Sequence, residues 1–336
     1  MLNLAVVGLG YWGPNLARNI SVSTRASLSA LCDTDERRVA KVTRQHPGTR
    51  GTTDYESILA DPEISGIAVA TPVSTHHALA RQALEAGKHV LVEKPLAATS
   101  SQAEDLLALA SDRGLMLLVD HVFLYSSPVR KLLEIYRSGE LGELNFVDSV
   151  RINLGLVQND VNVLWDLAPH DRSIIDGLLQ TTPQTVAAIG RSHVANGNVD
   201  VSYLHLDYDG VTAAVHLNWL SPVKIRHLMV GGSRKSVLYN DLDTAEPVKV
   251  YDSGVDVSDD PGRRRGLLVS YRSGDVHSPR VDTREPLSTL IDHFVDCVRY
   301  GVPPISGGEQ GLRIVRILEA ADHSLAAGGT PTKVGT

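Results

Sequence analysis

The sequence Leu4-Ala-Val-Val-Gly8-Leu-Gly10-Tyr-Trp-Gly13-Pro-Asn-Leu-Ala-Arg18 joins a short apolar run to a helical pattern through three glycines. The glycines have the G-x-G-x-x-G spacing of a strand–turn–helix that binds a dinucleotide. Gly8 permits a tight turn, Gly10 lets a pyrophosphate approach the backbone, and Gly13 lets the helix pack on the strand. The helix N-terminus offers N–H groups and partial positive charge to a phosphate. The stretch therefore predicts a dinucleotide site.

An acidic residue stands where a dinucleotide site needs one. Asp33 lies twenty residues beyond Gly13, directly after the second apolar run Leu28–Cys32. A carboxylate there accepts hydrogen bonds from the adenosine ribose and repels a 2′-phosphate. We therefore predict NAD(H) over NADP(H), although Arg37 and Arg38 follow closely and would weaken that preference. The alternative is a purely structural turn in which Asp33 caps a helix.

The composition is that of a soluble globular protein, with 336 residues of which 43% are hydrophobic and 21% charged. The net charge of −7 argues against a general binder of nucleic acid or anionic membranes. Cys32 and Cys297 are too few and too far apart for a disulfide framework or a cysteine metal site. Met1 leads straight into the first apolar run, and no apolar run could span a bilayer. We therefore expect a cytoplasmic protein without a signal peptide.

The length suggests two domains, and the pattern changes near residue 121. Up to that point, apolar runs alternate with helical patterns, which indicates a parallel sheet with crossover helices. The sequence thus predicts an α/β fold whose first domain, residues 1–121, is doubly wound. The remaining residues, 122–336, are expected to form a second α/β domain that binds substrate and mediates oligomerisation.

The second domain shows alternating rather than continuous apolarity. Apolar and polar residues alternate over Val211–Trp219, directly after Asp209-Gly210, which predicts a hairpin in an antiparallel or mixed sheet. Residues 252–285 predict a long loop, because they are rich in Gly, Ser, Asp and Arg. Two helices are expected near residues 286–300 and 308–327.

Ligands of an open parallel sheet bind beyond the carboxyl ends of its strands. That rule selects, besides the glycine turn and Asp33, the residues Thr71, Pro72, Glu93, Lys94, Pro95, Asp120 and His121. The Lys94 ammonium could stabilise an alkoxide that develops on a substrate oxygen, or it could be an ordinary solvated lysine. His76 opens a helix near the same edge, as a coenzyme contact or as a surface histidine.

Asp166 and His170 stand four residues apart, on one face of a helix if a helix begins there. Pro169 is tolerated only in a first turn, so Asp166 is expected near the N-cap. A carboxylate beside an imidazole favours its protonated state, which suits a general base during hydride transfer. The alternative is a capping aspartate with a surface histidine. The histidines show no metal-ligand spacing, so we predict no metal site.

These motifs together resemble those of the Gfo/Idh/MocA oxidoreductases. The matching pieces are Gly8–Gly13, Ala70–His76, Glu93-Lys94-Pro95 and Asp166-x-x-x-His170, in the order of that family. The resemblance implies an N-terminal Rossmann domain and a C-terminal domain with a large open sheet, often in a dimer or tetramer. The segment Asn162–His170 looks most similar to the UDP-N-acetylglucosamine and uronate 3-dehydrogenases. Leu167-Ala168-Pro169 and Ser173 depart from the glycine and aspartate that many members have there.

The resemblance also implies roles for individual residues. Lys94, Asp166 and His170 fall on the catalytic positions of the family. We expect the coenzyme to contact Gly8, Gly10, Tyr11, Trp12, Gly13, Asp33, Arg38, Thr71, Pro72, His76, Glu93 and Lys94. We expect the substrate to contact Lys94, Tyr125, Arg151, Asn153 and His170.

The sequence thus predicts an NAD-dependent sugar dehydrogenase or ketoreductase, acting on the third carbon of a nucleotide-diphosphate sugar or its uronic acid. An inositol or free-sugar dehydrogenase and a non-catalytic dinucleotide-binding regulator are the alternatives. The expected partners are a small-molecule substrate and further copies of the chain.

Overall fold

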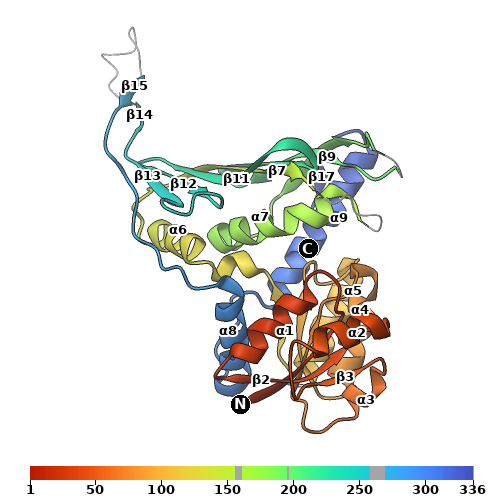
Figure 1. The fold of residues 1–336 in the computed structure, drawn as a ribbon. Coiled ribbons are helices and arrows are strands. Elements are labelled where there is room, and N and C mark those ends of the chain that lie inside the picture. Colours follow the sequence, from red (N-terminus) through yellow and green to blue (C-terminus); the bar gives the residue numbers. More distant parts are fainter. Residues whose placement is uncertain (156–160, 195–196, 258–268, 336) are drawn as a thin grey trace. The chain divides into compact units, whose positions relative to one another are not determined.

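The computed structural model describes residues 1–155, 161–194, 197–257 and 269–335, and the chain divides into two compact units (Figure 1). Unit 1 comprises Met1–Ser126 and Arg284–Glu319. Unit 2 comprises Ser127–Thr283 and Ala320–Thr336. Each unit is described by itself.

Unit 1 is built on a six-stranded parallel sheet of order β3-β2-β1-β4-β5-β6. Its strands are β1 (Leu2–Val7), β2 (Ala26–Cys32), β3 (Arg50–Thr52), β4 (Gly66–Val69), β5 (His89–Glu93) and β6 (Leu117–Asp120). The helices that connect them are α1 (Gly13–Val22), α2 (Glu36–Thr43), α3 (Glu56–Leu59), α4 (Val73–Glu85) and α5 (Ser100–Asp112). Every residue of β4 and β6 is buried, as expected of strands covered on both faces. The doubly wound prediction is confirmed.

The chain returns to unit 1 after unit 2, through α8 (Pro286–Tyr300) and the first part of α9 (Gly308–Ala326). Arg25 pairs with Asp296 of α8, while Ser306 donates its hydroxyl to the Val119 carbonyl of β6 at 2.6 Å. Unit 1 therefore differs from the predicted domain 1–121 in having this C-terminal segment. No local pattern could reveal it, because the contacts join residues far apart in the chain.

Unit 2 contains a nine-stranded mixed sheet of order β16-β13-β12-β11-β7-β10-β9-β8-β17. Its strands are β7 (Leu144–Leu154), β8 (Thr185–Arg191), β9 (Val201–Tyr208), β10 (Val211–Asn218), β11 (Leu220–Gly232), β12 (Ser236–Asn240), β13 (Val248–Tyr251), β16 (Val276–His277) and β17 (Thr332–Lys333). The pairs are antiparallel except β7 with β10. The predicted hairpin is confirmed as β9–β10, and Gly210 has the positive φ of 79° that its turn requires.

The region predicted as one long loop, 252–285, contains strands. β14 (Gly254–Val257) pairs with β15 (Val269–Arg272), and β16 continues the large sheet. That prediction was wrong for these strands, while residues 258–268 of the same region lie outside the described residues.

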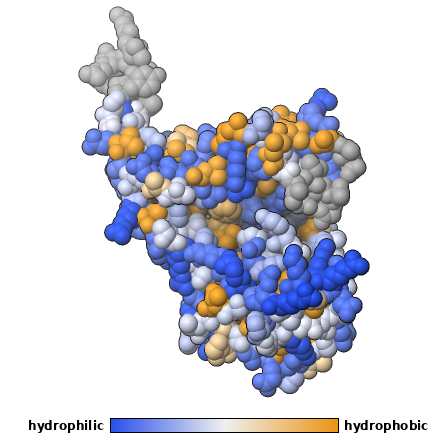
Figure 2. All heavy atoms as spheres, viewed as in Figure 1, coloured by the Kyte–Doolittle hydropathy of each residue, from blue (hydrophilic) through white to orange (hydrophobic). Residues whose placement is uncertain are grey.

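One face of the large sheet is covered by helices. Figure 1 shows α6 (Ser127–Arg137) and α7 (Val163–Leu179) on the same side of it. The face turned away carries exposed apolar side chains, among them Ile189, Tyr203 and Phe146. Figure 2 shows hydrophobic patches over the region of β9 and β11. Among the described residues, the helices include none long and apolar enough to cross a membrane.

Candidate active site

The glycine turn of unit 1 has the shape that a pyrophosphate needs. A Cβ on Gly13 would lie 1.8 Å from the Gly8 carbonyl oxygen, so only glycine fits there. Gly8 has φ of +92°, and a Cβ there would lie 2.5 Å from the Ala70 oxygen. A Cβ on Gly10 would meet only Arg38 Nη1, at 3.9 Å. The surface at Gly10 is therefore open, which is the condition for close approach of a ligand to the backbone.

The start of α1 is suited to an anion. Its N-cap residue, Trp12, makes no side-chain capping bond, and the first turn contains no acidic residue. The first N–H groups of the helix and its positive dipole end are thus not neutralised by a carboxylate of the helix itself. Gly8, Gly10, Gly13 and this helix end have the features that the pyrophosphate of a dinucleotide requires.

Asp33 is held rigidly at the end of β2. Its Oδ2 accepts the Leu9 N–H at 2.6 Å and its Oδ1 accepts the Asp35 N–H at 2.9 Å. The side chain is only 7% exposed, while Arg38 lies 3.7 Å away with 55% of its side chain exposed. The carboxylate is positioned to receive ribose hydroxyls, and the exposed guanidinium beside it is the feature that could admit a 2′-phosphate.

His76 ties together two loops at the carboxyl edge of the sheet. Its Nδ1 lies 2.8 Å from the Pro95 carbonyl oxygen, and its Nε2 lies 2.8 Å from the Thr71 carbonyl oxygen. The side chain is buried, so the surface alternative for His76 was wrong. Its neighbour His77 is the one that pairs outward, with Asp105 at 2.7 Å. The expected coenzyme contacts of Thr71, Pro72 and His76 stay predictions.

Lys94 follows β5, and the Lys94–Pro95 peptide bond is cis. The neighbouring strand β6 ends in Asp120, which pairs in register with Glu93. Asp120 is 1% exposed and accepts the indole N–H of Trp12 at 2.6 Å. Burial raises the pKa of Asp120 to about 6, although the Trp12 bond and the charge of Lys94 act in the opposite direction.

Tyr125 lies inside unit 1 and not at its surface. It is 1% exposed, its hydroxyl lies 2.9 Å from Ser306 Oγ, and burial raises its pKa. The expected substrate contact of Tyr125 stays a prediction, and this burial weighs against it.

In unit 2, α7 begins earlier than the sequence suggests. Its N-cap is Asn162, whose side-chain oxygen accepts the N–H groups of Leu164 at 3.0 Å and Trp165 at 3.2 Å. Asp166 therefore lies inside the helix and not at its cap, and Pro169 stands beyond the first turn. The missing N–H of a proline there leaves the carbonyl four residues earlier without its helical donor. Asp166 was predicted near the N-cap, but Asn162 occupies that position and Asp166 lies four residues later.

The carboxylate of Asp166 is held by a tryptophan from another element. The indole N–H of Trp219, a residue 1% exposed, donates to Asp166 Oδ2 at 3.0 Å. His170 follows one helical turn later, so both side chains belong to one face of α7. An imidazole can act as a general base, and a fixed carboxylate on the same helix face favours its protonated form.

Arg151 and Asn153 differ sharply. Arg151 forms a bidentate ion pair with Asp171, at 2.8 and 2.9 Å, and both side chains are less than 5% exposed. Its expected substrate contact stays a prediction, and this pairing weighs against it. Asn153 Oδ1 is buried without a hydrogen-bond partner among the described residues. A Cβ on Gly155 would lie 3.1 Å from both Asn153 Nδ2 and Trp219 Cδ1, so Asn153 neighbours the tryptophan that holds Asp166.

Trp219 and Asp120 support the candidate site through hydrogen bonds that the sequence did not predict. Trp219 appeared only as an apolar strand residue, and Asp120 appeared only as a position on the carboxyl edge. A tryptophan at the end of an alternating strand and an aspartate directly after a buried strand were the available signals.

Comparison with known protein families gives one match in the N-terminal part of the chain and another in the part that follows it. Residues 2–121 match the oxidoreductase family with an NAD-binding Rossmann fold, and residues 129–238 match the Gfo/Idh/MocA C-terminal domain. The chain belongs to the Gfo/Idh/MocA family.

Three relatives illustrate the range. The scyllo-inositol 2-dehydrogenase (NADP(+)) IolW of Bacillus subtilis is 25% identical over 85% of this chain and 84% of its own. The UDP-N-acetylglucosamine 3-dehydrogenase of Acidithiobacillus ferrooxidans is 26% identical over 58% of this chain and 60% of its own. GenD2 from gentamicin A biosynthesis, solved in complex with NAD, is 26% identical, covers 100% of this chain and 97% of its own, and superposes with a TM-score of 0.83.

Proposed function

We propose that this Gfo/Idh/MocA oxidoreductase transfers a hydride between NAD(H) and a ring carbinol or ketone of a sugar. The observation that carries the proposal is the hydrogen bond from Trp219 to Asp166, one helical turn from His170. A carboxylate that is fixed beside an imidazole has a chemical use in an oxidoreductase. A binding regulator would need neither residue.

The reacting carbinol would lose a hydride to bound NAD, the hydride acceptor, and a proton to the protein. In this proposal, His170 takes the hydroxyl proton and Asp166 favours the imidazolium that results. The Lys94 ammonium stabilises the negative charge that develops on the substrate oxygen. In the reverse direction the same groups return the proton to the ketone oxygen.

We propose NAD(H) as the preferred coenzyme, because both oxygens of the Asp33 carboxylate are fixed beside the glycine turn. One relative carries NADP(+) in its name and a solved neighbour holds NAD, so the preference of this chain needs its own test. Titration of both coenzymes against intrinsic tryptophan fluorescence decides the question. Equal or tighter binding of NADP(H) would overturn the preference.

For the substrate we propose the third carbon of a nucleotide-diphosphate sugar or its uronic acid. The likeness to the UDP-N-acetylglucosamine 3-dehydrogenase supports this choice, and the buried amide oxygen of Asn153 supplies an acceptor for a sugar hydroxyl. The longer match to the inositol dehydrogenase makes a free polyol the second candidate.

The deciding assay compares nucleotide sugars, free hexoses, uronic acids and inositols with NAD, and follows product by mass spectrometry and absorbance at 340 nm. Remote binding energy from a nucleotide serves catalysis, so its removal should lower kcat as well as raise KM. If free sugars or inositols react as well as nucleotide sugars, the polyol dehydrogenase replaces our proposal.

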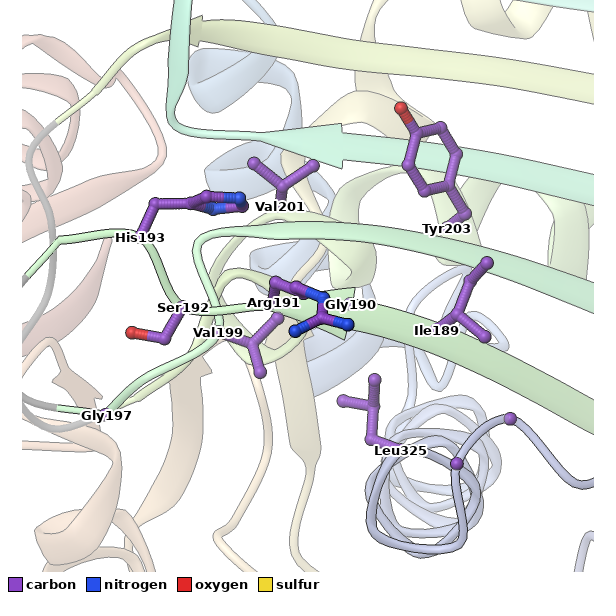
Figure 3. Close-up of a pocket in the computed structure, with 12 residues that line it drawn as sticks. Ile189, Gly190, Arg191, Ser192, His193, Gly197, Val199, Val201, Tyr203 and Leu325 are labelled. Carbon is purple, nitrogen blue, oxygen red and sulfur yellow. The ribbon is translucent and has the colours of Figure 1, made fainter.

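We further propose a homodimer or homotetramer that forms through the open sheet face of unit 2. Ile189 is 57% exposed and pairs with Tyr203, which is 49% exposed and stacks on His216 with ring centroids 4.3 Å apart. Ile189 and Tyr203 border a hollow of about 700 Å³ that Leu325 of α9 also lines (Figure 3). A contiguous exposed apolar area of this kind is commonly an interface. A monomeric mass by light scattering at micromolar concentration would refute the assembly.

A further inference from the structure

We propose that Asp120 is a positioning residue that joins Trp12 of the glycine turn to Lys94, and thereby couples the coenzyme loop to the catalytic lysine within unit 1. The inference rests on the proposed role of Lys94. Asp120 has no part in the general base described above.

The first observation is where Asp120 stands in the sheet. It is the last residue of β6 and pairs in register with Glu93, the last residue of β5. Lys94 is the next residue after that pair, and neighbouring strands lie only about 4.8 Å apart. The carboxylate and the lysine therefore leave the sheet at the same level of its carboxyl edge.

The second observation is the reach of Trp12. The indole belongs to the turn after β1, whereas its acceptor Asp120 belongs to β6, and β4 and β5 lie between these two strands. Three strand spacings amount to about 14 Å. The Trp12 side chain is thus directed along the carboxyl edge, where a coenzyme that binds at the glycine turn must extend.

The third observation is an acceptor without a donor. Asp120 Oδ2 receives the indole N–H, but Oδ1 is buried without a hydrogen-bond partner among the residues that the structure describes. A buried carboxylate oxygen is costly unless a donor or a cation reaches it. Lys94 is a cation whose charge acts on this carboxyl group. The link between the carboxylate and the ammonium is therefore electrostatic.

The charged and titratable neighbours of Asp120 come from β5 and from the segment that follows β6. β5 contributes Glu93 and Lys94, the next residue in the chain is His121, and the 3-10 turn Val122–Tyr125 contributes Tyr125. Burial disfavours the carboxylate, whereas Trp12 and Lys94 favour it, and the resulting pKa of Asp120 is about 6. The two residues that Asp120 is proposed to join thus both favour its ionised form, against the effect of burial.

The first experiment measures the pKa of Asp120 directly, by carboxyl ¹³C NMR on the full chain with Asp120→Asn to assign the signal. Lys94→Met removes the cation and should raise the pKa of Asp120 above its wild-type value. Trp12→Phe removes the hydrogen bond and should raise it too. The exposed Asp112→Asn is the matched control and should leave it unchanged. An unchanged pKa in Lys94→Met overturns the proposal.

That titration needs no substrate, so its result stands whether or not the proposed sugar chemistry is right. The second experiment uses Asp120→Asn in turnover. Asparagine still accepts the Trp12 bond but carries no charge, so kcat should fall about tenfold while KM for the coenzyme changes little. Trp12→Phe should instead weaken coenzyme binding. A wild-type kcat in Asp120→Asn, in an enzyme that Lys94→Met inactivates, would also overturn the coupling.

Discussion

The glycine turn of unit 1 and the start of α7 in unit 2 position polar chemistry in opposite ways. In the turn, the backbone itself is the candidate binding surface: Gly10 leaves it open, while Gly8 and Gly13 allow the close packing that shapes the turn. At the start of α7, side chains make the defining contacts: Asn162 accepts backbone N–H groups at the N-cap, and the Trp219 indole donates to the Asp166 carboxylate.

This difference determines how each region should respond to mutation. A turn that depends on empty space fails when a single Cβ fills that space. A region held by several hydrogen bonds, each contributing roughly 1 kcal/mol net, should lose function in smaller steps.

The largest effect is expected at the turn. There, one glycine substitution should affect the stability of the fold and another should affect only coenzyme affinity. Gly13→Ala places a Cβ 1.8 Å from the Gly8 oxygen, so the turn must open, and Tm should fall by roughly 10 °C or more. Gly10→Ala meets no close atom, so Tm should stay unchanged while the Kd for NADH rises about tenfold or more. Thermal unfolding and NADH titration measure both. Wild-type NADH affinity in Gly10→Ala would show that the pyrophosphate does not approach there.

Next in size is the loss of the proposed catalytic groups. Lys94→Ala and His170→Ala should each lower kcat by about 10³-fold, because both act in the transition state, and should barely change the Kd for NADH. Asp166→Asn should cost less if it only orients the imidazole. Stopped-flow measurement at 340 nm gives these values. Near wild-type turnover in Lys94→Ala would remove the lysine from the mechanism.

The Asp120 carboxylate is expected to lower the stability of the fold while it supports activity. Its pKa in the folded protein, about 6, lies above the ordinary value of 3.8, so the folded state binds the proton more tightly. The stability that protonation provides is present below pH 3.8 and is lost as pH rises through 6. Asp120→Asn should therefore raise the free energy of unfolding at pH 8, by at most about 3 kcal/mol.

Urea unfolding at pH 8 and pH 5 tests that expectation. The gain in Asp120→Asn should be about 1 kcal/mol smaller at pH 5, where the wild-type carboxyl is mostly protonated. A variant that is less stable than the wild type at pH 8 would contradict it.

The smallest effect is expected at the tryptophan that holds Asp166. Trp219→Phe removes one hydrogen bond to a carboxylate and should lower kcat about tenfold. Trp165→Phe is the matched control, because its indole donates to Asp322 and not to a proposed catalytic group. Equal losses of kcat in the two variants would show that the Asp166 contact has no special role.

The same contrast explains what the sequence could predict. The glycine spacing, the parallel strands and the β9–β10 hairpin follow from patterns within about thirty residues, so they were predictable. The contact of Trp219 with Asp166 joins positions 53 residues apart, and that of Trp12 with Asp120 joins positions 108 apart. No periodicity encodes such pairs. The pairing of Arg151 with Asp171 spans only 20 residues, but it joins a strand to a helix, and no local pattern indicates that these two elements pack together.

The return of the chain to unit 1 has a consequence for synthesis on the ribosome. The exposed edge of β6 forms its bridge to Gly307, and its bonds to Ser306, only when residues far downstream have emerged. Until then the nascent first 126 residues lack α8, whose Phe294 is fully buried in the finished unit. Contacts at such long sequence separation slow folding and leave strand edges open to wrong partners. A chain organised in this way should depend on chaperones during translation more than a Rossmann domain that is complete in one segment.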